Sequence, residues 1–297
     1  MAAIAEELVL APRAAPPRLV GGLLGFARHK PVAAGAALVL LAVCLVAVLA
    51  PVFAPYGPNT VFLRDRLAHP SSRHLFGGDQ LGRDVLTRVI YGARVSLAAG
   101  LGATALGVGF GVLFGVISGY AGGLFDQVIQ RCMDAIMALP PIILLMVLAT
   151  TLSPNLRNVI IAIAVFVTPG SARIVRGAVL SVKAMTYVEA AQALGVPPSR
   201  VVWRHVLPNV VAPVIVIASI TVGSVIIIEA ALGFLGLSVH EPTATWGNML
   251  NTGAQSYMEQ APWLALAPGI AIAVTVFAIN LFGDGLRDAL DPRLRGR

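Results

Sequence analysis

Few residues of this 297-residue sequence have the types and spacing that a chemical reaction would need. The only lysines are Lys30 and Lys183, and neither stands in the G-x-x-x-x-G-K-[ST] pattern of a phosphate-binding loop. Four other titratable residues are too scattered to predict a metal cluster or an acid–base pair, namely His205, His240, Asp284 and Asp288. We therefore expect no catalytic residue, no metal and no cofactor. If ATP drives this protein, it must act through another subunit.

Two polar interruptions of apolar runs are candidates for a role in binding or gating. Glu229 is the only acid well inside an apolar run, and a carboxylate within a membrane is costly unless it faces a cavity or a partner. It either has a structural role or lines a substrate path or outer gate. Thr168 and Pro169, followed by Gly170 and Ser171, place small and polar groups in another run, which favours either close packing or a pore lining.

A polar segment between two apolar runs carries the most specific pattern. It reads E-A-A, three residues, G, eleven residues, L-P, which here is Glu189, Ala190, Ala191, Gly195, Leu207 and Pro208. Good helix formers lead up to Gly195, which can close a helix in the left-handed conformation, and the two prolines that soon follow prevent its continuation. The alanines offer small surfaces to a partner. The pattern predicts a short, rigidly terminated helix.

The elements that hold these residues are solvated by lipid. Apolar residues make up 57% of the chain and charged residues 12%, about half the usual share, and the mean hydropathy is +0.84. This composition excludes a soluble enzyme, a disordered chain and a coiled coil. The net charge of +7 does not predict nucleic-acid binding, because the basic residues lie between or beside apolar runs without a basic stripe or an aromatic platform.

Apolar runs near 20 residues long, the length that crosses a bilayer, occur five times. They are Val32–Phe53, Val95–Gly119, Ala135–Leu152, Val210–Ile228 and Ala261–Gly283. A sixth run, Val159–Ala172, is short, but charge counting includes it. If it spans, 14 basic residues lie inside and seven outside; if it does not, the counts become five and 16, against the positive-inside tendency. We predict an all-α membrane protein with six transmembrane helices and both termini in the cytoplasm.

This topology divides the chain into a cytoplasmic tail (1–31), a first helix (32–53), an extracytoplasmic segment (54–94), a five-helix core (95–284) and a cytoplasmic tail (285–297). The E-A-A pattern falls in a cytoplasmic loop of the core, 182–207. An amphipathic helix is expected in the outer segment over Asp79–Ala93, with Arg83, Asp84 and Arg88 opposite its apolar stripe. Six of the seven outside basic residues lie between Leu63 and Val95 and are a noticeable excess there, namely Arg64, Arg66, Arg73, Arg83, Arg88 and Arg94; the seventh is Arg157.

The E-A-A pattern resembles the cytoplasmic loop of ABC importer permeases, and the resemblance implies that its six residues form a helix and loop that dock onto a cytoplasmic ATPase and couple it to transport. Two further segments, HLFGGDQLGRDVLTRVIYGAR from His74 and IIIEAALGFLGLS from Ile226, are similar to the second permease subunit of dipeptide and oligopeptide importers. His205 departs from the general pattern, in which isoleucine is frequent at that position. The resemblance covers nearly the whole chain after Pro31.

The resemblance implies a type I ABC importer permease that forms a translocation path for di- or oligopeptides by alternating access. It also implies a location in the plasma (inner) membrane of a prokaryote and several partners besides the lipid bilayer. These are a homologous second permease subunit, two cytoplasmic ATPase subunits and an extracytoplasmic substrate-binding protein. The substrate stays open, because nickel and some glycoside importers share this subunit type.

Two classes of function other than an ABC permease would leave different signals in the sequence. A secondary transporter driven by an ion gradient would show internal repeats and ionisable residues near the middle of the membrane. Only Glu229 is an ionisable residue of this kind. A membrane-embedded enzyme would need paired carboxylates, a metal cluster or a nucleophile with its base, and the sequence shows none of these.

Overall fold

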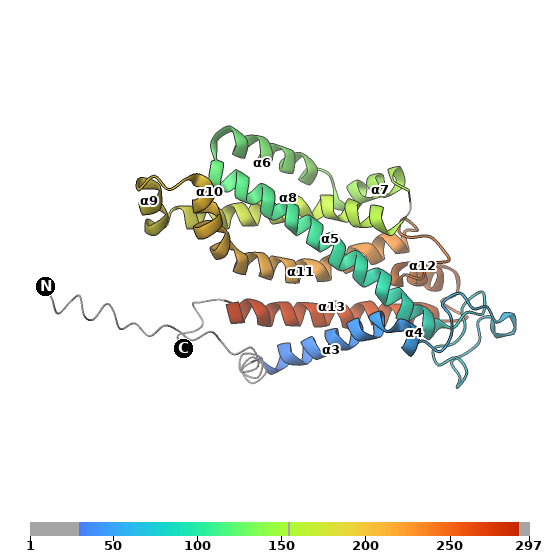
Figure 1. The fold of residues 1–297 in the computed structure, drawn as a ribbon. Coiled ribbons are helices and arrows are strands. Elements are labelled where there is room, and N and C mark those ends of the chain that lie inside the picture. The colour runs from blue at the N-terminus through green and yellow to red at the C-terminus, as the bar shows by residue number, and fades with distance from the viewer. Residues whose placement is uncertain (1–29, 154, 291–297) are drawn as a thin grey trace.

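The computed structural model describes residues 30–153 and 155–290, and these residues fold into a bundle of helices (Figure 1). Five helices are long and apolar enough to cross a membrane, and the count becomes six if one bent pair is taken as a single span. The long helices are α3 (Pro31–Val48), α5 (Val85–Ala121), α8 (Leu156–Lys183), α11 (Leu207–Phe234) and α13 (Trp263–Leu290). The predicted all-helical membrane fold is confirmed for the part of the chain described.

Shorter elements connect the long helices. They are α4 (Ala50–Phe53), α6 (Gly123–Met137), α7 (Pro141–Thr151), α9 (Thr186–Ala193), α10 (Pro198–Val201) and α12 (Trp246–Ser256), with a 3-10 turn at Leu63–Asp65 and a π-helical turn at Val202–Val206. In Figure 1, α9 and α10 lie at one end of the bundle, while α4, α12 and the segment between α4 and α5 lie at the other.

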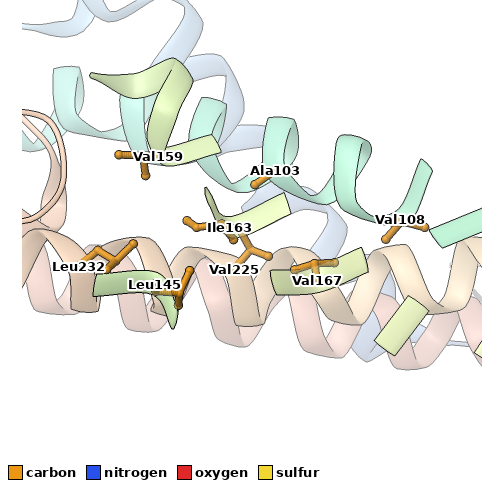
Figure 2. Packing of buried hydrophobic residues seen from close by; sticks show 8 residues of the cluster. All are labelled: Ala103, Val108, Leu145, Val159, Ile163, Val167, Val225 and Leu232. Atoms are coloured by element: carbon orange, nitrogen blue, oxygen red, sulfur yellow. The ribbon is translucent and has the colours of Figure 1, made fainter. Parts of the chain in front are cut away.

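The core lies where α5, α7, α8 and α11 meet. Figure 2 shows eight of its buried residues, which are Ala103, Val108, Leu145, Val159, Ile163, Val167, Val225 and Leu232. On the other side of the bundle, α3 lies along α13, and Lys30 Nζ lies 2.6 Å from Asp288 Oδ2 where these two helices meet the tails. Most of both predicted tails, residues 1–29 and 291–297, lies outside the described residues.

Close contact between α5 and α8 depends on glycines that recur at every fourth position of α5. A Cβ on Gly107 would lie 2.8 Å from Val167 Cβ, and one on Gly115 would lie 2.6 Å from the carbonyl oxygen of Ala172. Residues four apart share one face of a helix, so these glycines form a strip along which α8 packs. The sequence analysis missed this strip, although its spacing is visible in the sequence.

The sixth apolar run is the middle of a much longer helix. Asn155 caps α8 by accepting a hydrogen bond from the backbone N–H of Asn158 at 3.0 Å, and the helix then continues for 28 residues. Arg157 and Arg173 are both helical, so the charged ends that shortened the apolar run do not shorten the helix. The helix is therefore long enough to cross a membrane, as the charge count predicted.

The third predicted span, Ala135–Leu152, is wrong as a single helix. Helix α6 ends at Met137 and α7 begins at Pro141, and the two helices are bent by 89°. Pro140 and Pro141 have no N–H groups to donate to the preceding turn, so the helix stops before them. Proline is accepted in the first turn of a helix, and Pro141 therefore starts α7.

The separate outer helix expected over Asp79–Ala93 is also wrong. Residues up to Asp84 form turns, and Val85 begins α5, which continues without interruption through the predicted second span. Asp84 caps this helix, since its Oδ2 accepts a hydrogen bond from the N–H of Thr87 at 2.7 Å. Arg88, which the pattern placed on the polar face, is 2% exposed. Its partners come from a distant connection that periodicity cannot reveal.

Candidate coupling loop and transport path

The docking helix expected from the sequence is α9, which contains Glu189, Ala190 and Ala191. Gly195 has φ +74°, the left-handed conformation that favours glycine. The N–H of Gly195 donates to the carbonyl of Gln192 at 2.9 Å, and the N–H of Val196 donates to that of Ala191 at 3.1 Å. These two bonds are a Schellman motif, which satisfies the last carbonyl groups of a helix. The predicted termination at Gly195 is therefore present.

One side of this loop is fixed to the bundle. Val188 of α9 and Val206 of the π-helical turn are fully buried, and they belong to a cluster that includes Val175 and Val179 of α8. The chain then enters α11 at Leu207, with Pro208 in the first turn, as expected.

The other side of the loop is open. Glu189 and Ala190 are exposed, and Leu194 and Trp203 expose 84% and 74% of their surface. The open side therefore presents small, apolar and acidic residues on a helix that is anchored from behind.

Lys183, the last residue of α8, ties the loop to a second long helix. Its Nζ donates to the carbonyl of Tyr120 at 2.8 Å and lies 5.4 Å from the centre of the Tyr120 ring. Tyr120 belongs to the last turn of α5, where carbonyl groups have no partner within the helix. Lys183 therefore satisfies one of these groups and joins the ends of α5 and α8.

A cavity of about 410 Å³ lies between α8, α11 and the α6–α7 bend. Its walls include Gly170 and Ser171 of α8, Thr221 and Ser224 of α11, and Met137 at the end of α6. The rest of its lining is mainly aliphatic, and among the described residues no charged side chain lines it. Such a lining offers no fixed charge that would bind an anion in preference to a cation.

The three candidate path residues do not line this cavity. Thr168 Oγ1 donates to the carbonyl of Ala164 at 2.8 Å and lies 3.3 Å from that of Gly107, so it faces α5. Pro169 is buried in the middle of α8, but the two residues that follow it, Gly170 and Ser171, reach the cavity. The observed contacts of Thr168 correspond to the packing role.

Glu229 is 1% exposed and connects α11 to the chain that follows it. Its Oε1 accepts a hydrogen bond from Ser238 Oγ at 3.1 Å, whereas its Oε2 has no hydrogen-bond partner among the described residues. The carboxylate holds the beginning of the α11–α12 connection against α11. This contact corresponds to the structural reading of Glu229.

An ion-pair network that the sequence analysis missed joins the same connection to the outer segment. Glu241 accepts hydrogen bonds from Arg83 Nη1 at 2.7 Å and from Arg88 Nη2 at 2.9 Å, and Arg83 Nε lies 2.6 Å from Asp79 Oδ2. Burial lowers the pKa of Arg83, but its hydrogen bonds and its attraction to Glu241 and Asp79 outweigh burial and raise that pKa above the usual value. The excess of outside arginines was the available signal, and two of those arginines are buried here.

A buried histidine stabilises the other part of the outer segment. His74 is 1% exposed, and its Nδ1 lies 2.9 Å from Asp84 Oδ1 while its Nε2 lies 3.2 Å from Asp65 Oδ2. Since Asp84 also caps α5, the histidine links the turns of the outer segment to the start of a core helix.

Comparison with known proteins places this architecture. Residues 111–296 match the family described as binding-protein-dependent transport system inner membrane component, and residues 25–70 match the N-terminal TM domain of oligopeptide transport permease C. The chain is 44% identical over 270 residues to the glutathione transport system permease protein GsiD of Escherichia coli O6:K15:H31 (strain 536 / UPEC), covering 91% of this chain and 89% of that protein. GsiD of Shigella sonnei (strain Ss046) gives the same identity and coverage.

A solved structure of the MetNI methionine ABC transporter, described as inward facing, has a similar fold. The TM-score is 0.58 at 20% sequence identity, and the match covers 69% of this chain and 97% of that one.

Proposed function

Because the chain belongs to the family of binding-protein-dependent transport system inner membrane components, we propose that it forms half of the translocation path of an ATP-driven importer of short peptides. The curated relatives named above support glutathione and similar small peptides as the substrate class. The chain is a transport subunit, and ATP hydrolysis belongs to separate subunits. Its place is the plasma (inner) membrane of a prokaryote.

The loop of residues 182–207, called the coupling loop from here on, is the observation that carries this proposal. Its buried valines fix one side to α8, while α9 and Trp203 leave the other side open. A surface anchored in this way transmits the movement of a bound protein to the bundle, because the loop and α8 are packed together and move as one. We propose that α9 docks onto a cytoplasmic ATPase, and that Glu189, Ala190, Ala191, Gly195, Leu207 and Pro208 build and fix this docking surface.

The complete importer would contain four further proteins. A homologous permease subunit would cover the cavity between α8, α11 and the α6–α7 bend, and two ATPase subunits would bind the two coupling loops. A substrate-binding protein would dock on the outer segment, where Glu241 and His74 hold the turns in a defined arrangement. Alternating access follows if closure of the ATPases shifts the loops and changes the side to which the cavity opens.

The lining of the cavity suits a peptide path. Short peptides differ in side-chain charge and size, and a wall of aliphatic groups with a few hydroxyls offers no strongly bound state to any of them. Discrimination would therefore rest with the binding protein. Thr168, Pro169 and Glu229 would support the path from behind its surface.

Reconstitution in liposomes tests the proposed function against its rival. The permease pair, the ATPases and the binding protein loaded with radiolabelled glutathione or a dipeptide should give uptake only with ATP on the ATPase side. Ionophores that collapse proton and sodium gradients should leave that uptake unchanged. Uptake that follows an ion gradient without ATP would instead identify a secondary transporter.

A further inference from the structure

Helix α6 is loosely packed within this chain. Of its 15 residues only Met133 is buried, while Leu124, Phe125 and Val128 are 77%, 69% and 60% exposed. Apolar burial, which normally fixes the position of a helix, is therefore small here. Other contacts must determine where α6 lies relative to the bundle.

Two ion pairs connect α6 to α8. Arg176 holds Asp126 with two hydrogen bonds, Nε to Oδ1 at 2.7 Å and Nη2 to Oδ2 at 2.5 Å. One turn earlier in α8, Arg173 Nη2 lies 2.7 Å from Oδ1 of Asp134, which lies later in α6. The arginines are three residues apart and the acids eight residues apart, so each pair of residues shares one face of its helix.

The Arg176–Asp126 pair is the stronger tie. It is bidentate, and its side chains are 31% and 19% exposed, against 49% and 46% for Arg173 and Asp134. Asp126 also accepts a hydrogen bond from Ser118 Oγ of α5, so three helices meet at this carboxylate. Planar two-point contacts fix orientation as well as distance, which exposed single contacts do not.

The position of α6 connects the coupling loop to the cavity. Arg176 lies seven residues before Lys183, where α8 ends just ahead of α9. At its far end, α6 contributes Met137 to the cavity, and Pro141 follows across the bend. α8 lines the cavity directly, but a shift of α8 would move the α6–α7 side of the wall only if α6 follows α8.

We propose that Arg176 and Asp126 are positioning residues that make α6 follow α8, so that movement of the coupling loop reaches the α6–α7 bend in the cavity wall. This inference rests on the proposed function. Arg173 and Asp134 are a secondary tie. Without the Arg176–Asp126 pair, the ATPases would hydrolyse ATP without moving the α6–α7 bend.

The test uses the complete importer in liposomes with companion subunits that lack cysteine. Spin labels on the exposed native Cys132 of α6 and on Tyr187→Cys of α9, in a Cys44→Ala background, report the distance between α6 and the coupling loop. It is measured without nucleotide and with ATP trapped. Uptake per ATP hydrolysed is measured in parallel.

The distance distribution should stay narrow and unchanged between the two states with native Arg176, and should broaden or differ between them in Arg176→Gln. Uptake per ATP should fall by about tenfold in Arg176→Gln, as expected for loss of a bidentate charged contact. The reversed pair, Arg176→Asp with Asp126→Arg, should restore most of the coupling. Arg131→Gln, which removes an 87% exposed charge from α6, should change neither the distance distribution nor the uptake per ATP.

An unchanged distance distribution in Arg176→Gln would overturn the inference, whatever the uptake. If that variant does not assemble, Asp126→Asn is judged by the same criterion. A native complex with no ATP-dependent uptake would contradict the proposed function instead, while the distances would still show whether α6 follows α8.

Discussion

Arg88 of α5 and Glu241 of the α11–α12 connection are 153 positions apart in the sequence, and their Nη2 and Oε1 atoms lie 2.9 Å apart. The arginine side chain is 2% exposed, whereas that of the glutamate is 47% exposed. Glu241 also pairs with Arg83, and Asp79 Oδ2 lies 2.6 Å from Arg83 Nε and 3.7 Å from Arg88 Nε, so two carboxylates balance two buried guanidinium groups. The outer segment is therefore held to the far end of the bundle by charge as well as by apolar contact.

We predict that Glu241→Ala destabilises the protein by about 1–3 kcal/mol, because buried Arg88 loses its hydrogen-bond acceptor and keeps only the longer ion pair with Asp79, at 3.7 Å. The unfolding midpoint of the purified permease in detergent measures the effect. Glu259→Ala, which removes another exposed acid from the same end, is the control. Equal midpoints for the two variants would show that the network adds nothing to stability.

The glycine strip of α5 gives a second prediction. Gly115→Ala should destabilise the bundle by about 1–3 kcal/mol, because the new Cβ would meet the Ala172 carbonyl at 2.6 Å and Val175 Cβ at 2.7 Å. Gly109→Ala in the same helix meets nothing within 4 Å and should be neutral or slightly stabilising. Thermal unfolding of both variants in detergent measures the difference. A loss of stability in Gly109→Ala alone would contradict the packing described.

The Schellman motif at Gly195 gives a third prediction. A β-branched residue at φ +74° is strained by about 1–2 kcal/mol or more, so Gly195→Val should distort the end of α9. The permease should still insert in the membrane, while its association with the ATPases falls. Gly195→Asn is the matched control, because asparagine tolerates the left-handed conformation. Copurification of the ATPases measures both, and native levels with valine would remove Gly195 from coupling.

Glu229 gives a fourth prediction, since its observed contact is the hydrogen bond from Ser238. Glu229→Gln keeps an oxygen that can accept this bond, and uptake should stay within about twofold of native. Glu229→Leu removes the acceptor and should lower the unfolding midpoint. A large loss of uptake in the glutamine variant, with normal assembly and stability, would assign the carboxylate to the path or gate.

Much of the helical structure could be predicted from rules that depend on residues near in sequence. The helix ending at Gly195, the entry of α11 at Pro208 and the presence of a spanning helix at Val159–Ala172 follow from propensity, capping and charge counting, whereas the full length of α8 was not predicted. The break at Pro140 had a clear signal as well, but hydropathy measures the length of a run and not the direction of the chain.

The contacts between distant segments could not be derived in this way. Nothing near Arg88 indicates Glu241, and periodicity placed Arg88 on a polar face although its side chain is buried like those of Val85 and Ile90. The pairing of Arg176 with Asp126 joins two helices that the topology leaves unordered around the bundle. A single sequence gives the helices and their ends, while their neighbours depend on packing that only the structure supplies.

The central claim is that α9 is the point at which a cytoplasmic ATPase acts on this permease. A photo-crosslinking amino acid at Ala190, an exposed residue of α9, tests it in the assembled importer in membranes. The same probe at Asn59, in the outer segment, is the control. We expect a crosslink to the ATPase from position 190 and none from position 59. No crosslink from 190 in a complex that hydrolyses ATP, or a crosslink from 59, would show that the ATPase acts elsewhere.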